Sequence, residues 1–133
     1  MLPAAIFLLV VMATLAAFLV QITVASQIGG TQDMQGARAY QAARLGIETG
    51  LYSAQVNASC PGGTLSSIAG LTGFKITWAC TSTTFNEAGT SHTIYQITST
   101  ACTTAGGVCP SVTVSELRSS DYVERQLVVV TER

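Results

Sequence analysis

The chain opens with an almost uninterrupted run of apolar residues. Residues 2–20 are apolar apart from Thr14, and the first ionisable side chain is Asp33. About 20 residues of this kind are enough for a helix to cross a lipid bilayer. The pattern predicts an apolar helical segment over residues 1–26, which needs lipid or other copies of itself around it.

A second helix is predicted over residues 33–56, and this one is amphipathic. Apolar positions recur at spacings of three and four, which places them on one helix face: Tyr40, Ala43, Ile47, Leu51 and Ala54. Asp33 suits the first turn of a helix, because a negative charge there opposes the helix dipole. Arg44 and Glu48 are four residues apart and form a favourable surface pair.

Gly29 and Gly30 separate the two helical segments and predict a helix break. Each glycine weakens a helix by about 1 kcal/mol relative to alanine. The sequence leaves two interpretations open. The glycines belong to a plain loop, or they form a flexible stretch within one long helix of about 80 Å at 1.5 Å per residue.

After residue 56 the pattern changes to period two, which is typical of strands. The expected strands cover 74–80, 91–101, 112–115 and 122–131, with loops at 57–63 and 102–111 and a turn at 86–90. The apolar run 127–130 suggests burial on both faces of the last strand. Five aromatic residues are expected in the core: Tyr40, Tyr52, Phe74, Trp78 and Tyr95. The prediction is an α+β chain, with an N-terminal helix over 1–56 and a small antiparallel sheet domain over 57–133.

Composition changes this picture little, but it excludes some functions. The chain has 133 residues, of which 48% are hydrophobic and 10% charged, and its net charge is −1. Such a balance provides no basic field for nucleic acid, and the apolar opening argues against a soluble cytosolic protein. The opening segment has three interpretations: a secretory signal peptide, a simple membrane anchor, or the start of a processed chain. No basic residue precedes the apolar run, and Pro3 is tolerated in a first helical turn, so the third is favoured, with processing before Met1.

All four cysteines lie in the polar part of the chain. Their spacing contains no CxxC motif and fits no zinc site. An even number of cysteines in a small exported domain favours disulfides, with three possible pairings. We favour Cys60–Cys80, which ties the loop after the helix to the first strand, and Cys102–Cys109, which closes a short loop. Buried free thiols are the alternative.

Nothing in the sequence predicts an enzyme, a cofactor or a metal centre. The single histidine, His92, begins a predicted strand and is best interpreted as a surface residue. Glu116, Asp121 and Glu124 are interpreted as a solvated turn, since the calcium-loop pattern of alternating acids is missing. Residues 57–59 match the short and common N-glycosylation pattern.

Two segments carry a resemblance to a known family. They are LeuProAlaAlaIlePheLeuLeuValValMet (2–12) and GlyAlaArgAlaTyrGlnAlaAlaArgLeuGlyIleGluThrGlyLeuTyr (36–52). With the layout above, they resemble type IV pilin-like subunits, and are most similar to the MSHA minor pilin (MshP) family. The likeness covers about the first 55 residues, and the sheet region matches only in general layout.

The resemblance implies a structural function. A prepilin peptidase would cleave before Met1 and methylate its amine. The apolar segment would hold the subunit in the inner membrane until assembly machinery extracts it into an extracellular filament with other copies or other pilins. Residues of the filament-core helix would then be Pro3, Ile6, Phe7, Leu9, Val10, Leu15 and Phe18. The sheet would face outward and meet surfaces, partners or sugars.

One position departs from most of the family. Most of these pilins carry a glutamate at the fifth mature position, where this chain has Ala5. That carboxylate is thought to meet the terminal amine of a neighbouring subunit, and an unpaired buried amine is costly. MshP-like chains also tend to lack the acid. A minor, priming or tip pilin is therefore an alternative to a main subunit, and a membrane-anchored periplasmic adhesin or binding module is another.

Overall fold

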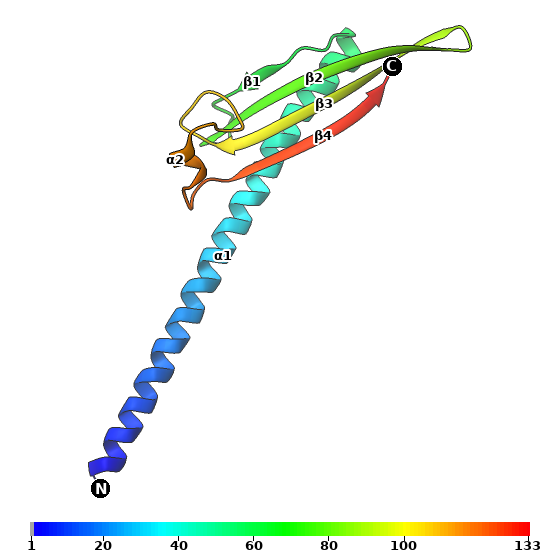
Figure 1. The fold of residues 1–133 in the computed structure, drawn as a ribbon. Helices are drawn as coiled ribbons and strands as arrows, with labels where there is room; N and C mark the ends of the chain where they lie inside the picture. The colour runs from blue at the N-terminus through cyan, green and yellow to red at the C-terminus, as the bar shows by residue number, and fades with distance from the viewer. Residues whose placement is uncertain (1) are drawn as a thin grey trace. The chain divides into compact units, whose positions relative to one another are not determined.

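The computed structural model describes residues 2–133, and it has an α+β architecture (Figure 1). Helix α1 comes first and a four-stranded sheet follows, with a short helix before the last strand. In chain order the elements are α1 (Leu2–Asn57), β1 (Gly63–Leu65), β2 (Phe74–Glu87), β3 (Thr90–Thr103), α2 (Val114–Leu117) and β4 (Glu124–Glu132). The sheet order is β1-β2-β3-β4, and every neighbouring pair is antiparallel. This confirms the fold class predicted from the sequence.

The chain divides into two compact units. The first ends at Met34, and the second covers Gln35–Arg133. The second unit, called the head below, contains the amphipathic half of α1 together with the sheet. The amphipathic half thus belongs structurally with the sheet against which it packs.

Helix α1 contains Gly29 and Gly30 as helical residues, so a break by a plain loop at this point is wrong, and the two predicted helical segments form one helix. A flexible stretch within that helix stays a prediction. The space around both glycines is open, since an added Cβ would meet nothing within 4 Å. Each glycine lowers helix stability by about 1 kcal/mol relative to alanine. The helix continues through both because it is already formed on either side, and extending a formed helix requires no new nucleation.

Small side chains form the face of α1 that packs on the sheet. The buried residues of this face are Ala39, Ala42, Ala43, Gly46, Ile47, Gly50 and Ala54. A Cβ on Gly46 would lie 2.2 Å from Ser99 Oγ, and one on Gly50 would lie 2.6 Å from Ile97 Cγ2. Glycine is therefore required at both positions by the close approach of the helix backbone to β3.

Two apolar clusters form the core of the head. One joins Ala39, Ala42 and Ala43 to Phe74, Ile76 and Ala101, and the other joins Ile47 and Ala54 to Tyr95 and Ile97. Leu127 of β4 packs against both clusters. The side chains on this face of the sheet alternate with outward-facing ones, as a half-covered antiparallel sheet requires.

Several predicted core positions are exposed. Phe74 and Tyr95 are buried and Trp78 is half-buried, but Tyr40 and Tyr52 are exposed. The prediction placed the large side chain of Tyr40 on the face of α1 that packs against the sheet, and this was wrong. The close helix–sheet approach instead selects the alanines beside Tyr40.

The predicted strands 74–80, 91–101 and 122–131 are confirmed as β2, β3 and β4, although β2 continues to Glu87. β2 and β3 form a hairpin whose turn has positive φ at Ala88 (52°) and Gly89 (90°), within the predicted turn. The predicted strand 112–115 is wrong, since α2 begins at Val114, and β1 was not predicted. Burial of 127–130 on both faces is also wrong, because only one face of β4 meets the helix. Val128 and Val130 are 51% and 62% exposed on the other face.

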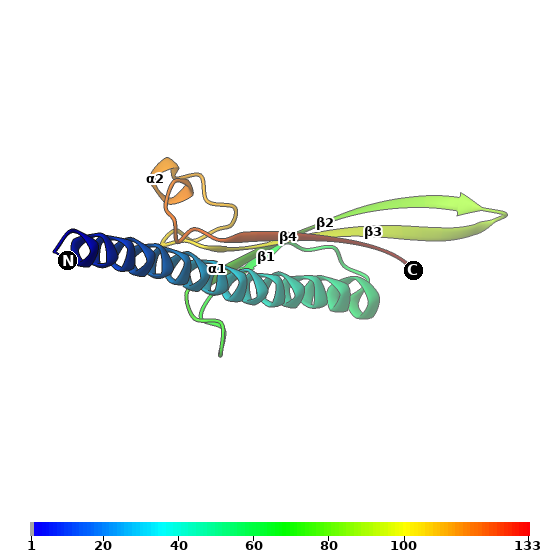
Figure 2. The same cartoon turned by 90° about the horizontal axis from the view of Figure 1, so that it is seen from below.

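The two faces of the sheet carry different coverings. Figure 2 shows the part of α1 that belongs to the head, residues 35–57, along one face of the sheet, and the segment that contains α2 on the opposite side at one end. The Cys109 amide donates to Thr77 Oγ1 at 2.8 Å, which holds this segment down on the outer face. The hairpin of β2 and β3 continues beyond the end of β4 as a two-stranded arm.

We expect Gly46→Ala to destabilise the head. The new methyl group would have to displace Ser99 and Ile76. Overpacking of this kind costs about 1–3 kcal/mol and exceeds the gain of about 1 kcal/mol in helix propensity. Thermal melting followed by circular dichroism in detergent measures the change. The matched control is Gly30→Ala, which meets open space and should leave the melting of the head unchanged. Equal melting temperatures for wild type and Gly46→Ala would contradict the close packing.

Candidate functional site

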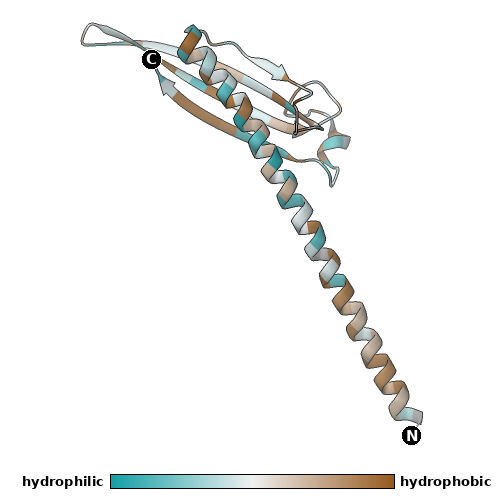
Figure 3. Ribbon diagram, turned by 180° about the vertical axis from the view of Figure 1, so that it is seen from behind, coloured by the Kyte–Doolittle hydropathy of each residue, from teal (hydrophilic) through white to brown (hydrophobic). Residues whose placement is uncertain are grey.

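The apolar segment of α1, residues 3–24, carries a continuous set of exposed hydrophobic side chains. All the described side chains over residues 3–24 are exposed except Val11, which is half-buried. In Figure 3 this part of the helix is largely brown or pale around its circumference. A helix that is apolar on all sides needs lipid or other helices as its surroundings.

The predicted filament-core residues all lie in this segment and all are exposed in the single chain. They are Pro3, Ile6, Phe7, Leu9, Val10, Leu15 and Phe18. Within residues 2–133, α1 is the one helix long and apolar enough to cross a membrane by length and composition. Ala5 lies among them and contributes no charge. The predicted processing residue Met1 lies outside the described residues.

The cysteines are joined as favoured from the sequence. Cys60 is bonded to Cys80, and Cys102 is bonded to Cys109. The first bond ties the loop after α1 to β2. The second bond fastens the segment after β3 on the outer face of the sheet. Since the core of the head is thin, these covalent links replace burial that a larger domain would have.

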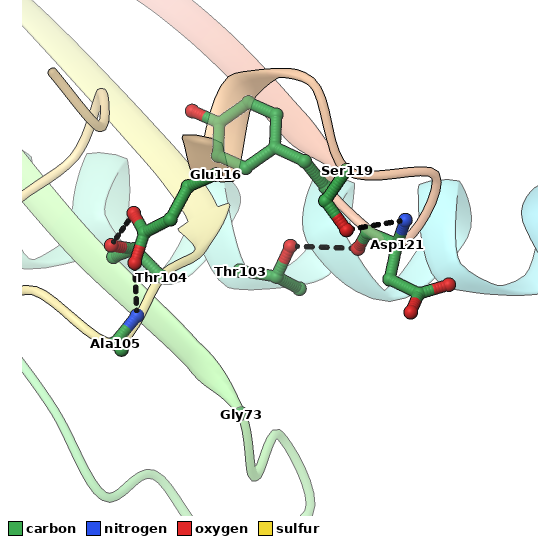
Figure 4. Close-up of a pocket in the computed structure, with 8 residues that line it drawn as sticks. Gly73, Thr103, Thr104, Ala105, Glu116, Ser119 and Asp121 are labelled. Atoms are coloured by element: carbon green, nitrogen blue, oxygen red, sulfur yellow. Dashed lines mark hydrogen bonds between the residues drawn. The ribbon is translucent and has the colours of Figure 1, made fainter. Parts of the chain in front are cut away.

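A small cavity of about 290 Å³ lies where β3 ends, beside α2. Figure 4 shows its lining, with Glu116 turned toward Thr104 and Ala105, and with Ser119 and Thr103 bonded to the Asp121 backbone. The cavity is open to solvent. Its polar lining comes from loops that the two central strands and α2 hold in place.

Glu116 is the most fully bonded acid of the head. Its Oε2 accepts hydrogen bonds from Ser111 Oγ at 2.5 Å and from Thr104 Oγ1 at 2.6 Å. Its Oε1 accepts from the Ala105 amide at 3.1 Å. One carboxylate therefore joins three points of the segment that follows β3.

These hydrogen bonds lower the pKa of Glu116 below its ordinary value of 4.5. The bond from Ser111 has the largest effect, followed by those from Thr104 and Ala105, and desolvation opposes them. A carboxylate that accepts several hydrogen bonds is stabilised in its ionised form. Both oxygens are occupied, so Glu116 acts as a tie between loops.

Tyr122 and Glu124 form a second bonded pair near the cavity. The Tyr122 hydroxyl donates to Glu124 and accepts from the Ser111 amide at 3.2 Å. Burial, and then the hydrogen bond to Glu124, raise the pKa of Tyr122. Of the acids interpreted from the sequence as a solvated turn, Glu116 thus bonds directly to Ser111, and Glu124 bonds to Tyr122, whose hydroxyl accepts from the Ser111 amide. No local pattern in the sequence predicts these contacts.

His92 lies at the other end of β3, away from this cavity. Its Nδ1 is 2.6 Å from Glu132 Oε1, and its ring stacks on Phe85 with centroids 5.6 Å apart. The structure therefore does not bring the histidine together with Glu116 or Asp121. Over residues 2–133, no group of three or more metal-ligating side chains is found. Asn57, the first residue of the N-glycosylation pattern, is exposed at the end of α1, and its modification stays a prediction.

Comparison with protein-family models, with curated proteins and with solved structures finds no match. Assignment of a function therefore depends on the residues and on the resemblance of the two N-terminal segments.

We predict that the stabilising effect of Glu116 depends on pH. The folded-state pKa is below the unfolded one, so the contribution is present above about pH 4.5 and is lost as the pH falls through the folded-state pKa. Melting temperatures of wild type and Glu116→Gln, measured from pH 7 to pH 3, test this. The difference between the two should be largest at pH 7 and should shrink toward pH 3. A constant difference across the range would mean that ionisation of Glu116 has no part in holding the loop.

Proposed function

We propose that the chain is a structural subunit of an extracellular type IV pilus-like filament. It polymerises through the apolar segment of α1 after a leader is cleaved. The observation that supports this most is the apolar segment itself, which is exposed around the whole helix and is joined to a disulfide-bonded head. The resemblance of residues 2–12 and 36–52 to pilin-like subunits points the same way.

The physical reason for assembly is burial of this segment. Each Å² of apolar surface removed from water contributes about 25 cal/mol. In the inner membrane, lipid satisfies the segment, and in a filament the neighbouring helices take the place of lipid. Helix–helix packing without lipid favours small residues that let backbones approach closely. Ala4, Ala5, Ala13, Ala16 and Ala17 provide such residues along the segment.

A minor, priming or tip subunit is the second candidate, and Ala5 favours it. A subunit inside a filament core buries its terminal amine beside its neighbours, and a carboxylate at position 5 would pair with that amine. Without the carboxylate, the amine needs another partner or water. At a filament tip the amine has fewer neighbours and the requirement is weaker. A membrane-anchored adhesin or binding module is the remaining alternative.

Intact mass spectrometry of filaments sheared from the cell surface separates these candidates. A main subunit dominates the sheared material, begins at Met1, carries one added methyl group and has lost four hydrogens to its two disulfides. A tip or priming subunit is processed in the same way but is scarce in filaments. A chain that keeps its leader and stays in the membrane contradicts the pilin proposal.

We expect Leu15→Arg to abolish incorporation into filaments. A charged residue at the centre of a membrane helix costs about 2.5–3.5 kcal/mol, and a bundle of apolar helices offers it no partner. Immunoblots of sheared and membrane fractions measure the effect. The matched control is Met34→Arg, which also replaces an exposed apolar side chain of α1 by arginine but lies next to Asp33, outside the apolar run. Normal incorporation of Leu15→Arg would contradict burial of this segment.

A further inference from the structure

We infer that the free edge of β4 binds the hairpin arm of a second copy of this chain, so that the sheet continues from one head to the next. The inference builds on the proposed filament, because it takes neighbouring copies to point the same way. It concerns the heads and does not depend on how the apolar helices pack.

In the middle of β4, over residues 126–130, three residues have backbone hydrogen-bonding groups that point away from β3. Thr93 and Arg133 exchange two bonds of 2.9 Å, and the Thr103 amide donates to Val123 O at 3.0 Å. Because alternate residues of an antiparallel strand face the partner strand, the odd-numbered residues of β4 face β3. The N–H and C=O groups of Gln126, Val128 and Val130 therefore point outward.

The free edge of β4 lacks the features that usually prevent edge pairing. Natural edge strands carry prolines, bulges or inward-pointing charges. The pairing of β3 with β4 runs without a bulge from Cys102↔Glu124 to Ile94↔Glu132, and residues 126–130 contain no charge and no proline. The end of the edge is covered, since Glu132 O accepts a hydrogen bond from Gln55 Nε2 at 3.1 Å. The middle is left open.

The side chains around this edge also lack a partner. Val128 and Val130 are exposed on the outer face of the sheet. On the helix side, Tyr40 is 46% exposed. It lies one turn after Gly36, whose position faces the Arg125 side chain of β4, so Tyr40 is on the β4 side of α1. A strand added beside β4 would cover apolar side chains on both faces at once.

The same chain presents a second free edge on the opposite side of the sheet. β1 pairs only with Ile76–Trp78, and Cys60 is fastened to Cys80, so β2 is uncovered from residue 81 to residue 87. The last part of this stretch, after Thr83, lies in the arm that extends beyond β4 in Figures 1 and 2, because Thr83 pairs with Ile94 and Ile94 pairs with Glu132. The arm is therefore free to reach a neighbouring head.

Strand direction decides how the two edges meet. β2 and β4 run the same way, since each is antiparallel to β3. Two copies with one orientation would therefore pair β4 with the neighbour's residues 81–87 as parallel strands. The face also matches, because Val130 pairs with Gln96, and Gln96 pairs with Thr81. Within one head Thr81 is level with Val130. A neighbour displaced along the strands by about four residues, ~13 Å at 3.3 Å per residue, would bring Phe85, on the same face as Thr81, beside Val130.

A two-fold pair of β4 strands is the main competing arrangement, and two observations disfavour it. Such a pair would be antiparallel, so the parts of α1 inside the two heads, residues 35–57, would run in opposite directions, whereas the proposed filament has neighbouring heads in one orientation. In the register that uses all three outward residues, with Val128 opposite Val128, Glu124 would also lie opposite Glu132, and like charges in that position are destabilising. A two-fold contact between identical edges ends at a dimer, whereas a contact between two different edges can repeat from copy to copy along a filament.

Cross-linking of the full chain in cell membranes and in sheared material tests the inference. Val128→Cys is co-expressed with Thr81→Cys, Thr83→Cys or Phe85→Cys on a second copy and treated with a short bis-maleimide. We expect a cross-linked dimer with at least one of these partners, at tenfold or more the yield of a Ser115→Cys control at the other end of the head. A dimer formed by Val128→Cys alone would show that two β4 strands pair about a two-fold axis. If no dimer forms with any of the three partners, the edge of β4 is unpaired. Either result overturns the inference.

A backbone variant separates edge pairing from contact of side chains. Val128→Pro removes an outward N–H that bonds to nothing within the head, so the fold should persist while cross-linking of Val130→Cys to Phe85→Cys falls at least tenfold. Val128→Thr keeps the N–H, so the same cysteine pair should cross-link as efficiently with threonine at position 128 as with the original valine. Val129→Pro removes an N–H directed at β3 and should unfold the sheet. Unchanged cross-linking in folded Val128→Pro would overturn the inference.

The cross-link tests the edge contact, and the presence of the chain in filaments tests the proposed function, so the two can fail independently. If filaments form normally and no cross-link appears, the edge contact is wrong and the proposed function stands. If the cross-link appears in membranes and no filament contains the chain, the edge contact stands and the proposed function fails.

Discussion

The close approach of α1 to the sheet is the contact on which the head depends. Gly46 and Gly50 remove the side chains that would hold the helix away from Ser99 and Ile97, and the alanines around them fill the remaining space. A helix that lies this close buries little apolar surface per residue, because its contact face is made of methyl groups and bare backbone. The contact is therefore stabilised by close packing and not by large side chains, and larger side chains at these positions are poorly tolerated.

The other stabilising features of the head compensate for this thin core. The disulfide between Cys60 and Cys80 fixes the end of the helix against β2, and Gln55 bonds to Thr131 and to the last carbonyl of β4. On the outer face, the Cys102–Cys109 bond and the Glu116 carboxylate hold a segment that has almost no regular structure. These contacts are polar or covalent, and most of them lie at the ends of strands. The middle of the outer face is left without a covering.

Much of the fold followed from the sequence, and the errors share a physical origin. Period-two alternation located β2 and β3, and the change of pattern after residue 56 located the end of α1. Tyr40 was placed in the core because periodicity identifies a face only to within one residue, while the limited space selected the smaller Ala39 and Ala43. The small residues at 39, 42, 43, 46, 50 and 54 were the available signal for close packing. The loop contacts of Glu116 depend on where three separate residues meet in space, which no local pattern contains.

The absence of charge before Asp33 has a mechanical consequence for any bundle of these helices. Ion pairs and buried polar groups fix the axial offset between packed helices, because a shift of one turn leaves them unpaired. Over residues 2–20 the one polar side chain is Thr14, and its hydroxyl donates to Val11 O of the same helix. This stretch therefore offers no such marker, and an axial shift exchanges one set of apolar contacts for a similar set. In a bundle built from this segment, the helices alone would set no unique offset and would resist sliding weakly. The heads, which lie outside the bundle, would then determine its length under tension.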